Sequence, residues 1–251
     1  MTLAYDVAGS GPGLLLLHAA ICDRRMWDPQ WEALAAAGFR VVRCDLRGYG
    51  ESPVPSAPYN AAEDIAEVLD AVGLESAAVI GCSYGGRVAQ EFAARWPERV
   101  SKLVLVCSSS SELEPGPALG EVWRREEAYI EAGEIDAAVD LNLAAFLGPE
   151  ASGATREHVR EMQRHAFDVQ LAADEEYPPT DVPFALSSIT APSLVISGAK
   201  DLPEFHEIAE RLIEALPDAR AVELPWAGHL PTLERPDELT ALLTEFLAPR
   251  S

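Results

Sequence analysis

Gly81-Cys82-Ser83-Tyr84-Gly85 is the only G-x-S-x-G sequence in the chain, and the rest of the chain is interpreted from it. The residues before it, Ala77-Ala78-Val79-Ile80, are apolar and predict a short buried strand. The residues after it predict a helix, because apolar side chains recur every four positions at Val88, Phe92 and Trp96. A strand that turns sharply into a helix at such a pentapeptide displays its serine at the carboxyl end of a sheet. Short Gly/Ser patterns also occur by chance in plain turns, but this context predicts that Ser83 is a nucleophile.

The candidate acid lies downstream of the serine. A serine hydroxyl needs a neighbouring base to remove its proton and a third group to orient that base. In proteins with this strand–serine–helix pattern, the acid follows the serine along the chain and the histidine follows the acid. Asp201 follows the predicted strand Leu194–Ser197 and a glycine turn, which places its carboxylate at the same sheet edge as Ser83. We therefore predict that Asp201 is the acid; the alternatives are a solvated loop aspartate at this position and two other acids, Glu204 and Glu112.

The candidate base is His229. It follows the last predicted strand, Ala221–Leu224, and Gly228 before it lets the loop reach back toward the sheet edge. We predict that His229 is the general base and acid, with Asp201 fixing its tautomer. The other four histidines suit structural or solvated positions in other loops and helices: His18, His158, His165 and His206.

Two N–H groups are expected to bind the oxyanion of the tetrahedral intermediate. One is the backbone N–H of Tyr84, the residue after the nucleophile. The second is expected from the loop after the predicted strand Leu14–Leu17, which reads His18-Ala19-Ala20, and we assign it to Ala20.

The chain alternates apolar, strand-like runs with helical stretches, which is typical of a mostly parallel sheet flanked by helices. The predicted strands are Leu14–Leu17, Val41–Asp45, Ala77–Ile80, Leu103–Val106, Leu194–Ser197 and Ala221–Leu224. Residues 108–188 break this alternation and predict helices over Leu119–Glu131, Ile135–Phe146 and Arg156–Ala172. We therefore predict an α/β core of residues 1–107 and 189–251, with residues 108–188 inserted as a helical cap, or lid.

The composition limits the classes of partner. The 251 residues suffice for one large α/β domain with an insertion, and the formal net charge is −22. This charge argues against nucleic acid and anionic membrane as partners. The chain shows no basic signal region, and its longest apolar run is too short to span a bilayer, so we expect a cytoplasmic protein. The cysteines lack metal-site spacing or a disulfide framework, and Cys44 and Cys107 are expected in the core.

Taken together, the chain resembles the α/β-hydrolase fold superfamily, and within it the small esterase, enol-lactonase and haloperoxidase-like branch. The similarity covers nearly the whole chain outside residues 108–188. It rests on ordered segments: Leu17-His18-Ala19-Ala20 with Trp27, Asp45-Leu46-Arg47-Gly48-Tyr49-Gly50-Glu51-Ser52, the pentapeptide around Ser83, Pro97-Glu98-Arg99-Val100, Gly198-Ala199-Lys200-Asp201, and Gly228-His229-Leu230-Pro231 followed by Glu234-Arg235-Pro236.

The resemblance implies a reaction. It implies acylation of Ser83 and hydrolysis of a small-molecule ester, thioester or lactone, with no metal or organic cofactor. It disfavours the related haloalkane dehalogenases and epoxide hydrolases, which use a carboxylate where this chain has Ser83. The chain departs from the family pattern twice. The usual His-Gly is His18-Ala19, and the short amino terminus predicts that the antiparallel first strand of the eight-stranded sheet is missing.

The substrate pocket is expected to be apolar and lined by Trp27, Trp123, Phe146, Phe167 and Leu230. Arg156, Arg160 and Arg164 interleave with acidic residues and predict an ion-paired face of the lid. Arg24 and Arg25 lie in the oxyanion loop, and the alternative is that one arginine of these two groups binds a substrate carboxylate. Two other functions stay open, namely a C–C bond hydrolase or lyase with the same triad, and a ligand receptor with residual hydrolysis. The oligomeric state also stays open.

Overall fold

The chain folds around one seven-stranded sheet in a computed structural model that describes residues 3–111, 116–175 and 177–248. The spatial order of the strands is β1-β3-β2-β4-β5-β6-β7. β1 pairs antiparallel with β3, and every other neighbouring pair is parallel. The mostly parallel α/β sheet predicted from the sequence is therefore confirmed. The strands are β1 (Tyr5–Ala8), β2 (Gly13–Leu17), β3 (Arg40–Cys44), β4 (Ala77–Cys82), β5 (Val100–Val106), β6 (Ser193–Gly198) and β7 (Ala219–Leu224).

The central strands are buried on both faces. Every residue of β2 and of β4 is buried. A strand covered on both sides reads as a continuous apolar run rather than an alternating one, which is why Leu14–Leu17 and Ala77–Ile80 were recognisable. β7 lies at the sheet edge and mixes exposed with half-buried residues.

The described sheet has seven strands, one fewer than the eight of the family pattern, as predicted, but it keeps an antiparallel strand at its edge. β1 pairs with β3 and places Tyr5 opposite Cys44 and Ala8 opposite Val41. Its sequence, Tyr-Asp-Val-Ala, is half-buried or exposed and has no apolar run, so periodicity carries no signal for it.

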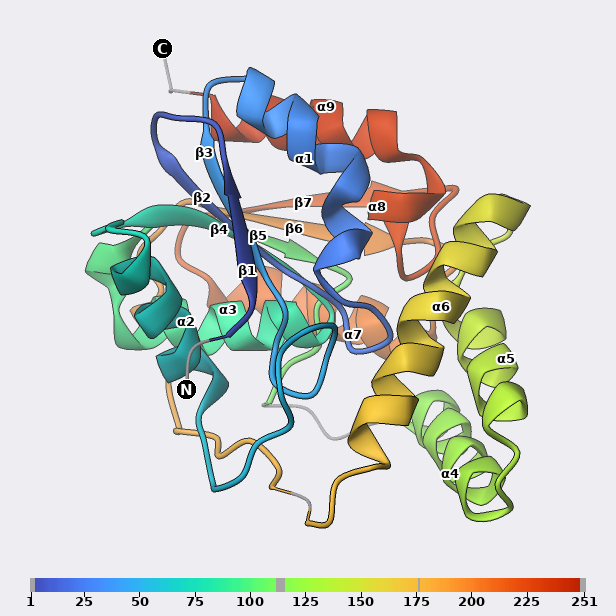
Figure 1. Ribbon diagram of the computed structural model, residues 1–251. Helices are drawn as coiled ribbons and strands as arrows, with labels where there is room; N and C mark the ends of the chain where they lie inside the picture. The colour runs from blue at the N-terminus through green and yellow to red at the C-terminus, as the bar shows by residue number, and fades with distance from the viewer. Residues whose placement is uncertain (1–2, 112–115, 176, 249–251) are drawn as a thin grey trace.

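Helices cover both faces of the sheet (Figure 1). α1 (Asp28–Ala36) and α9 (Pro236–Leu247) lie against one face, and α2 (Ala61–Ala71), α3 (Tyr84–Arg95) and α7 (Pro203–Ala215) lie against the other. Short helical turns complete this part: η1 (Arg24–Trp27), η2 (Pro97–Arg99), η3 (Leu186–Ser188) and α8 (Pro231–Glu234). No helix in the described ranges is long and apolar enough to cross a membrane.

Three helices are inserted between β5 and β6: α4 (Pro117–Glu131), α5 (Ile135–Phe146) and α6 (Gly153–Gln170). These inserted helices pack in succession, α4 on α5 and α5 on α6, and stand beside the sheet in Figure 1. The Ser152 hydroxyl caps the start of α6, and the Glu204 carboxylate accepts hydrogen bonds from the first turn of α4. α5 has the predicted bounds, whereas α4 and α6 begin two and three residues earlier than predicted.

The start of α3 presses against the end of β2. A Cβ on Gly85 would lie 2.6 Å from the carbonyl oxygens of Leu17 and His18. Both atoms belong to the backbone and cannot swing away. Glycine is therefore required at residue 85 by close approach.

We predict that Gly85→Ala lowers the free energy of unfolding by about 3 kcal/mol, because the added methyl group overpacks against fixed backbone. Gly120→Ala in α4 is the matched control, since a Cβ there meets nothing within 4 Å. It should stabilise the protein by up to about 1 kcal/mol. Urea unfolding of both variants provides the measurement, and equal effects would refute the packing argument.

Candidate active site

Ser83 lies at the turn between β4 and α3, as predicted. Its backbone has φ 52° and ψ −115°, a conformation that side-chain-bearing residues rarely adopt. The Ser83 N–H donates to Val106 O at 3.0 Å, which ties the turn to β5. The Ser83 carbonyl accepts from the backbone N–H groups of Gly86, Arg87 and Ser109. These four bonds hold a strained residue in one position, as is common at functional sites.

Asp201 and His229 form a buried pair. His229 Nδ1 lies 2.7 Å from Asp201 Oδ2, and their side chains are 2% and 1% exposed. A carboxylate only accepts, so Nδ1 carries the proton in this contact. The Asp201 N–H donates to Gly198 O at the end of β6, which fixes the turn that carries the acid.

Ser83 and His229 line the same cavity, which has a volume of about 840 Å³. The phenyl rings of Phe146 and Phe205 pack on the imidazole, with ring centroids 5.1 Å and 4.1 Å from it. Between Ser83 Oγ and His229 Nε2, both in described parts of the chain, no direct hydrogen bond is made. The contact between Asp201 and His229 is therefore formed, and Ser83 lines the same cavity as His229.

Neither of the two alternative acids, Glu204 and Glu112, has a hydrogen bond or ion pair to His229 that the structure describes. Glu204 Oε1 accepts from the N–H groups of Ala118 and Leu119 at 2.7 and 3.1 Å, so this carboxylate caps α4. Glu112 lies outside the described residues. The other histidines contact backbone carbonyl groups or a surface carboxylate rather than an acid near Ser83.

The predicted oxyanion donors also reach the cavity. Ala20 and Tyr84 both line it, and neither backbone N–H donates to another described residue. The N–H of Ala19 points instead to the sulfur of Met26, 3.2 Å away. The Ala20 N–H, unlike that of Ala19, has no partner among the described residues, which is compatible with the predicted role.

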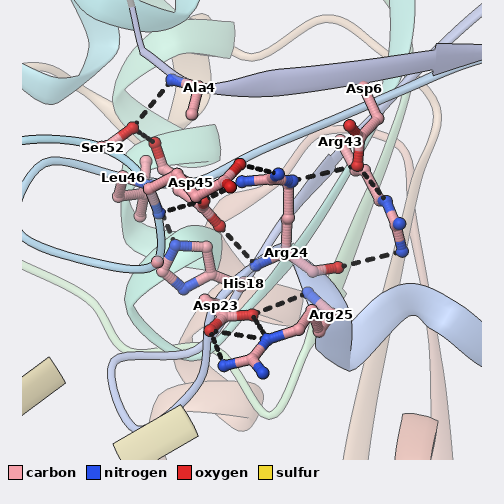
Figure 2. A network of polar contacts seen from close by, with 12 residues as sticks. Ala4, Asp6, His18, Asp23, Arg24, Arg25, Arg43, Asp45, Leu46 and Ser52 are labelled. Carbon is pink, nitrogen blue, oxygen red and sulfur yellow. Dashed lines mark hydrogen bonds and ion pairs between the residues drawn. The ribbon is translucent and has the colours of Figure 1, made fainter. Parts of the chain in front are cut away.

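The loop that carries Ala20 is held by the polar network of Figure 2. His18 is fully buried; its Nδ1 donates to Ala19 O, and its Nε2 accepts from the Leu46 N–H, both at 2.9 Å. Asp45 accepts from the Arg24 N–H at 2.7 Å and pairs with the Arg24 guanidinium group. The charged residues of this network are visible in the sequence, but which of them pair with one another could not be inferred from it.

Glu234 is a site residue that the sequence analysis missed. Its buried carboxylate accepts from the N–H groups on either side of His229, those of Gly228 at 2.8 Å and Leu230 at 3.2 Å. It also accepts from the Gly148 N–H at 3.1 Å, just after α5. In the sequence, the one indication of a role for Glu234 was its place in a segment that carries the family resemblance.

Three of the five residues expected in the pocket line the cavity: Trp123, Phe146 and Phe167. The predictions for Trp27 and Leu230 are wrong, since both side chains are fully buried in the hydrophobic core and neither lines the cavity. η1 carries Trp27 into the core beside Met26. Leu230, the residue after His229, packs in the hydrophobic core.

Of the three lid arginines predicted on an ion-paired face, Arg160 and Arg164 pair with acidic side chains. Arg156 donates to a backbone carbonyl and forms no ion pair with a described residue. Arg24 pairs with Asp6, Asp45 and Glu51, and Arg25 pairs with Asp23. None of these five lines the cavity, which disfavours their role in binding a substrate carboxylate.

Cys107 lies beside the acid–base pair, and its sulfur could join Asp201 and His229 in a metal site. Burial raises the pKa of the Cys107 thiol well above 9.0, and a protonated thiol is a poor metal ligand. The imidazole and carboxylate also already bind each other, so these residues do not fit a metal. All four cysteines are buried free thiols, and Cys44 and Cys107 lie in the core as predicted.

The chain belongs to the alpha/beta hydrolase fold family, whose model matches residues 12–236. The resemblance stated from the sequence is confirmed, and the chain is an enzyme of this family. It is 30% identical over 258 residues to pimeloyl-[acyl-carrier protein] methyl ester esterase of Chromobacterium violaceum, with 98% of each chain covered.

Two further similarities are informative. The putative carbamate hydrolase RutD of a Caulobacter species is 32% identical over 233 residues, covering 88% of this chain and 85% of that protein. Among solved structures, the enol-lactonase of Burkholderia xenovorans LB400 superposes with a TM-score of 0.79 at 27% identity, over 98% of this chain and 96% of that one.

We predict that His18 makes stability depend on pH. Burial lowers the pKa of His18 below 6.5 and outweighs the opposite effect of Asp45 and Asp23. Below pH 6.5 the unfolded chain therefore binds this proton more readily than the folded one. The stabilisation present above pH 6.5 is lost as the pH falls toward the lower folded pKa, by up to about 1.4 kcal/mol per pH unit.

The measurement is urea unfolding of the wild type and of His18→Gln between pH 7 and pH 5. The variant cannot titrate at this position, so its free energy of unfolding should fall less steeply with decreasing pH. Parallel pH profiles for the two proteins would contradict the assignment.

Proposed function

We propose that this protein is a serine hydrolase that cleaves small-molecule carboxylic esters, thioesters or lactones through an acyl-enzyme. The observation that carries the proposal is the buried 2.7 Å contact between Asp201 and His229 in the cavity that Ser83 lines. The names of the relatives support it, since a methyl ester esterase and an enol-lactonase both act on acyl–oxygen bonds.

The proposed reaction has two stages. His229 Nε2 removes the Ser83 hydroxyl proton as the oxygen attacks the substrate carbonyl, and the N–H groups of Tyr84 and Ala20 bind the oxyanion. His229 then gives the proton to the leaving alcohol or thiol. In the second stage, water attacks the carbonyl of the acyl-Ser83 while His229 removes a proton from the water. His229 then gives this proton to the Ser83 oxygen as the acid product leaves. The Asp201 carboxylate stabilises the imidazolium ion that forms in each stage.

We also propose roles for the parts around these residues. Residues 1–107 and 189–251 form the hydrolase core, and residues 108–188 act as a lid that shapes the pocket with Trp123, Phe146 and Phe167. The charge of −22 supports a cytoplasmic enzyme of small molecules with no nucleic acid partner.

We predict that Ser83→Ala lowers the turnover of p-nitrophenyl butyrate by about 10³-fold or more, because no other group replaces the nucleophile. Ser101→Ala is the matched control, since Ser101 is exposed on β5 and does not line the cavity. Steady-state kinetics provide the measurement. Full activity of Ser83→Ala would reject the mechanism, and a single turnover followed by a stable adduct in the wild type would favour a receptor.

We predict that Asp201→Asn lowers kcat by a factor on the order of 10³–10⁴ while the protein stays folded, because the amide no longer fixes the productive tautomer of His229. Glu204→Gln tests the alternative acid in parallel. Its main effect should be on stability, since Glu204 caps α4. Circular dichroism and kcat measurements on both variants distinguish the acids, and a larger loss of kcat in Glu204→Gln would exclude Asp201.

A further inference from the structure

The inserted helices present four polar residues to the cavity: Glu126 from α4, Asn142 from α5, and Gln163 and Gln170 from α6. Gln170 donates to the Gly48 carbonyl. We call the other three residues the polar triplet. Each lies one helical turn from an aromatic residue that also lines the cavity, namely Trp123, Phe146 and Phe167. Phe146 packs on the His229 ring, and Asn142 lies one helical turn before it on α5.

Two acceptors of the polar triplet have no donor. The Asn142 Nδ2 group donates to the Glu126 carboxylate, which orients the amide and leaves its Oδ1 on the other side. Asn142 Oδ1 and Gln163 Oε1 are buried and accept from no described residue. The two residues are 1% and 4% exposed. A buried acceptor without a donor is destabilising by about 1–3 kcal/mol, so a ligand that supplies N–H groups here removes that penalty.

Glu126 is a carboxylate without a cation. Burial raises its pKa, the Asn142 amide acts in the opposite direction, and no lysine or arginine of the described chain contributes. The two arginines in the cavity wall have carboxylate partners of their own, Asp64 for Arg47 and Asp181 for Arg87. The negative charge of Glu126 is therefore available to a ligand.

The wall of the cavity is acidic as a whole. Its described residues include five carboxylates and two guanidinium groups, the carboxylates being Glu126, Glu175, Asp181, Glu204 and Glu207. A cleft lined mainly by one sign of charge attracts the opposite sign and repels its own. This wall favours a cationic ligand over an anionic one.

We propose that the polar triplet is an ammonium subsite, and that the preferred substrates are esters or lactones whose end remote from the scissile carbonyl carries a protonated amine. A primary ammonium group has three N–H donors and no acceptor. Among the residues that line the cavity, the polar triplet supplies one carboxylate and two amide groups. The inference rests on the proposed function for the reaction, but the subsite itself is measurable without turnover.

The first test measures binding by calorimetry with 6-amino-1-hexanol and 1-heptanol, which match in length and differ in the terminal ammonium group. The amine should bind about tenfold tighter or better at pH 7, as charge-assisted hydrogen bonds predict. Glu126→Gln should remove this preference. Glu121→Gln should retain it, because Glu121 is exposed on the same helix, pairs with Arg124 and does not line the cavity. Equal or weaker binding of the amine by the wild type, which needs no variant, would overturn the proposal.

The second test compares kcat/KM for p-nitrophenyl 6-aminohexanoate and p-nitrophenyl heptanoate. The ratio should exceed about ten in the wild type and fall toward one in Glu126→Gln. Hydrolysis of both esters without an advantage for the amine would reject the subsite and leave the proposed function intact. Preferential amine binding without hydrolysis of either ester would reject the proposed function and leave the subsite intact.

Discussion

The close approach of the first turn of α3, just after Ser83, to the end of β2 is the constraint on which the site depends. α3 begins directly against the ends of β2 and β5, at distances where glycine is the one residue that fits. The turn places Ser83 in a strained conformation, and its N–H and carbonyl groups are both tied down by neighbouring segments. The position of Ser83 is thus set by the packing of the core. Asp201 and His229 lie in the loops after β6 and β7.

The parts of the fold that could be predicted from the sequence are those in which burial leaves a continuous apolar run or a helical period. β2, β4 and α5 are of this kind. Asp201 and His229 could be predicted because parallel strands end at one edge, so residues just after β6 and β7 meet there. β1 could not, because its stability comes from pairing with β3 and not from apolar side chains of its own.

The direction in which a side chain points is harder to predict than its position along the chain. Trp27 and Phe146 are both large aromatic residues near the site, yet the first is enclosed in the core and the second packs on His229. An aromatic side chain favours burial at both positions, but the residue type does not tell which part of the protein it packs against. The same holds for Glu234 and Asp45, whose partners lie far along the chain and depend on the completed fold.

The inserted helices and His229 are connected through two residues, Phe146 and Glu234. Phe146 at the end of α5 packs on the His229 ring, and its carbonyl accepts from the His229 N–H at 3.0 Å. Glu234 binds the backbone on both sides of His229 and also that of Gly148. A displacement of α5 therefore strains hydrogen bonds that fix the imidazole. Because Asn142 lies one turn from Phe146 on the same helix, a ligand held there acts on the helix that positions the base.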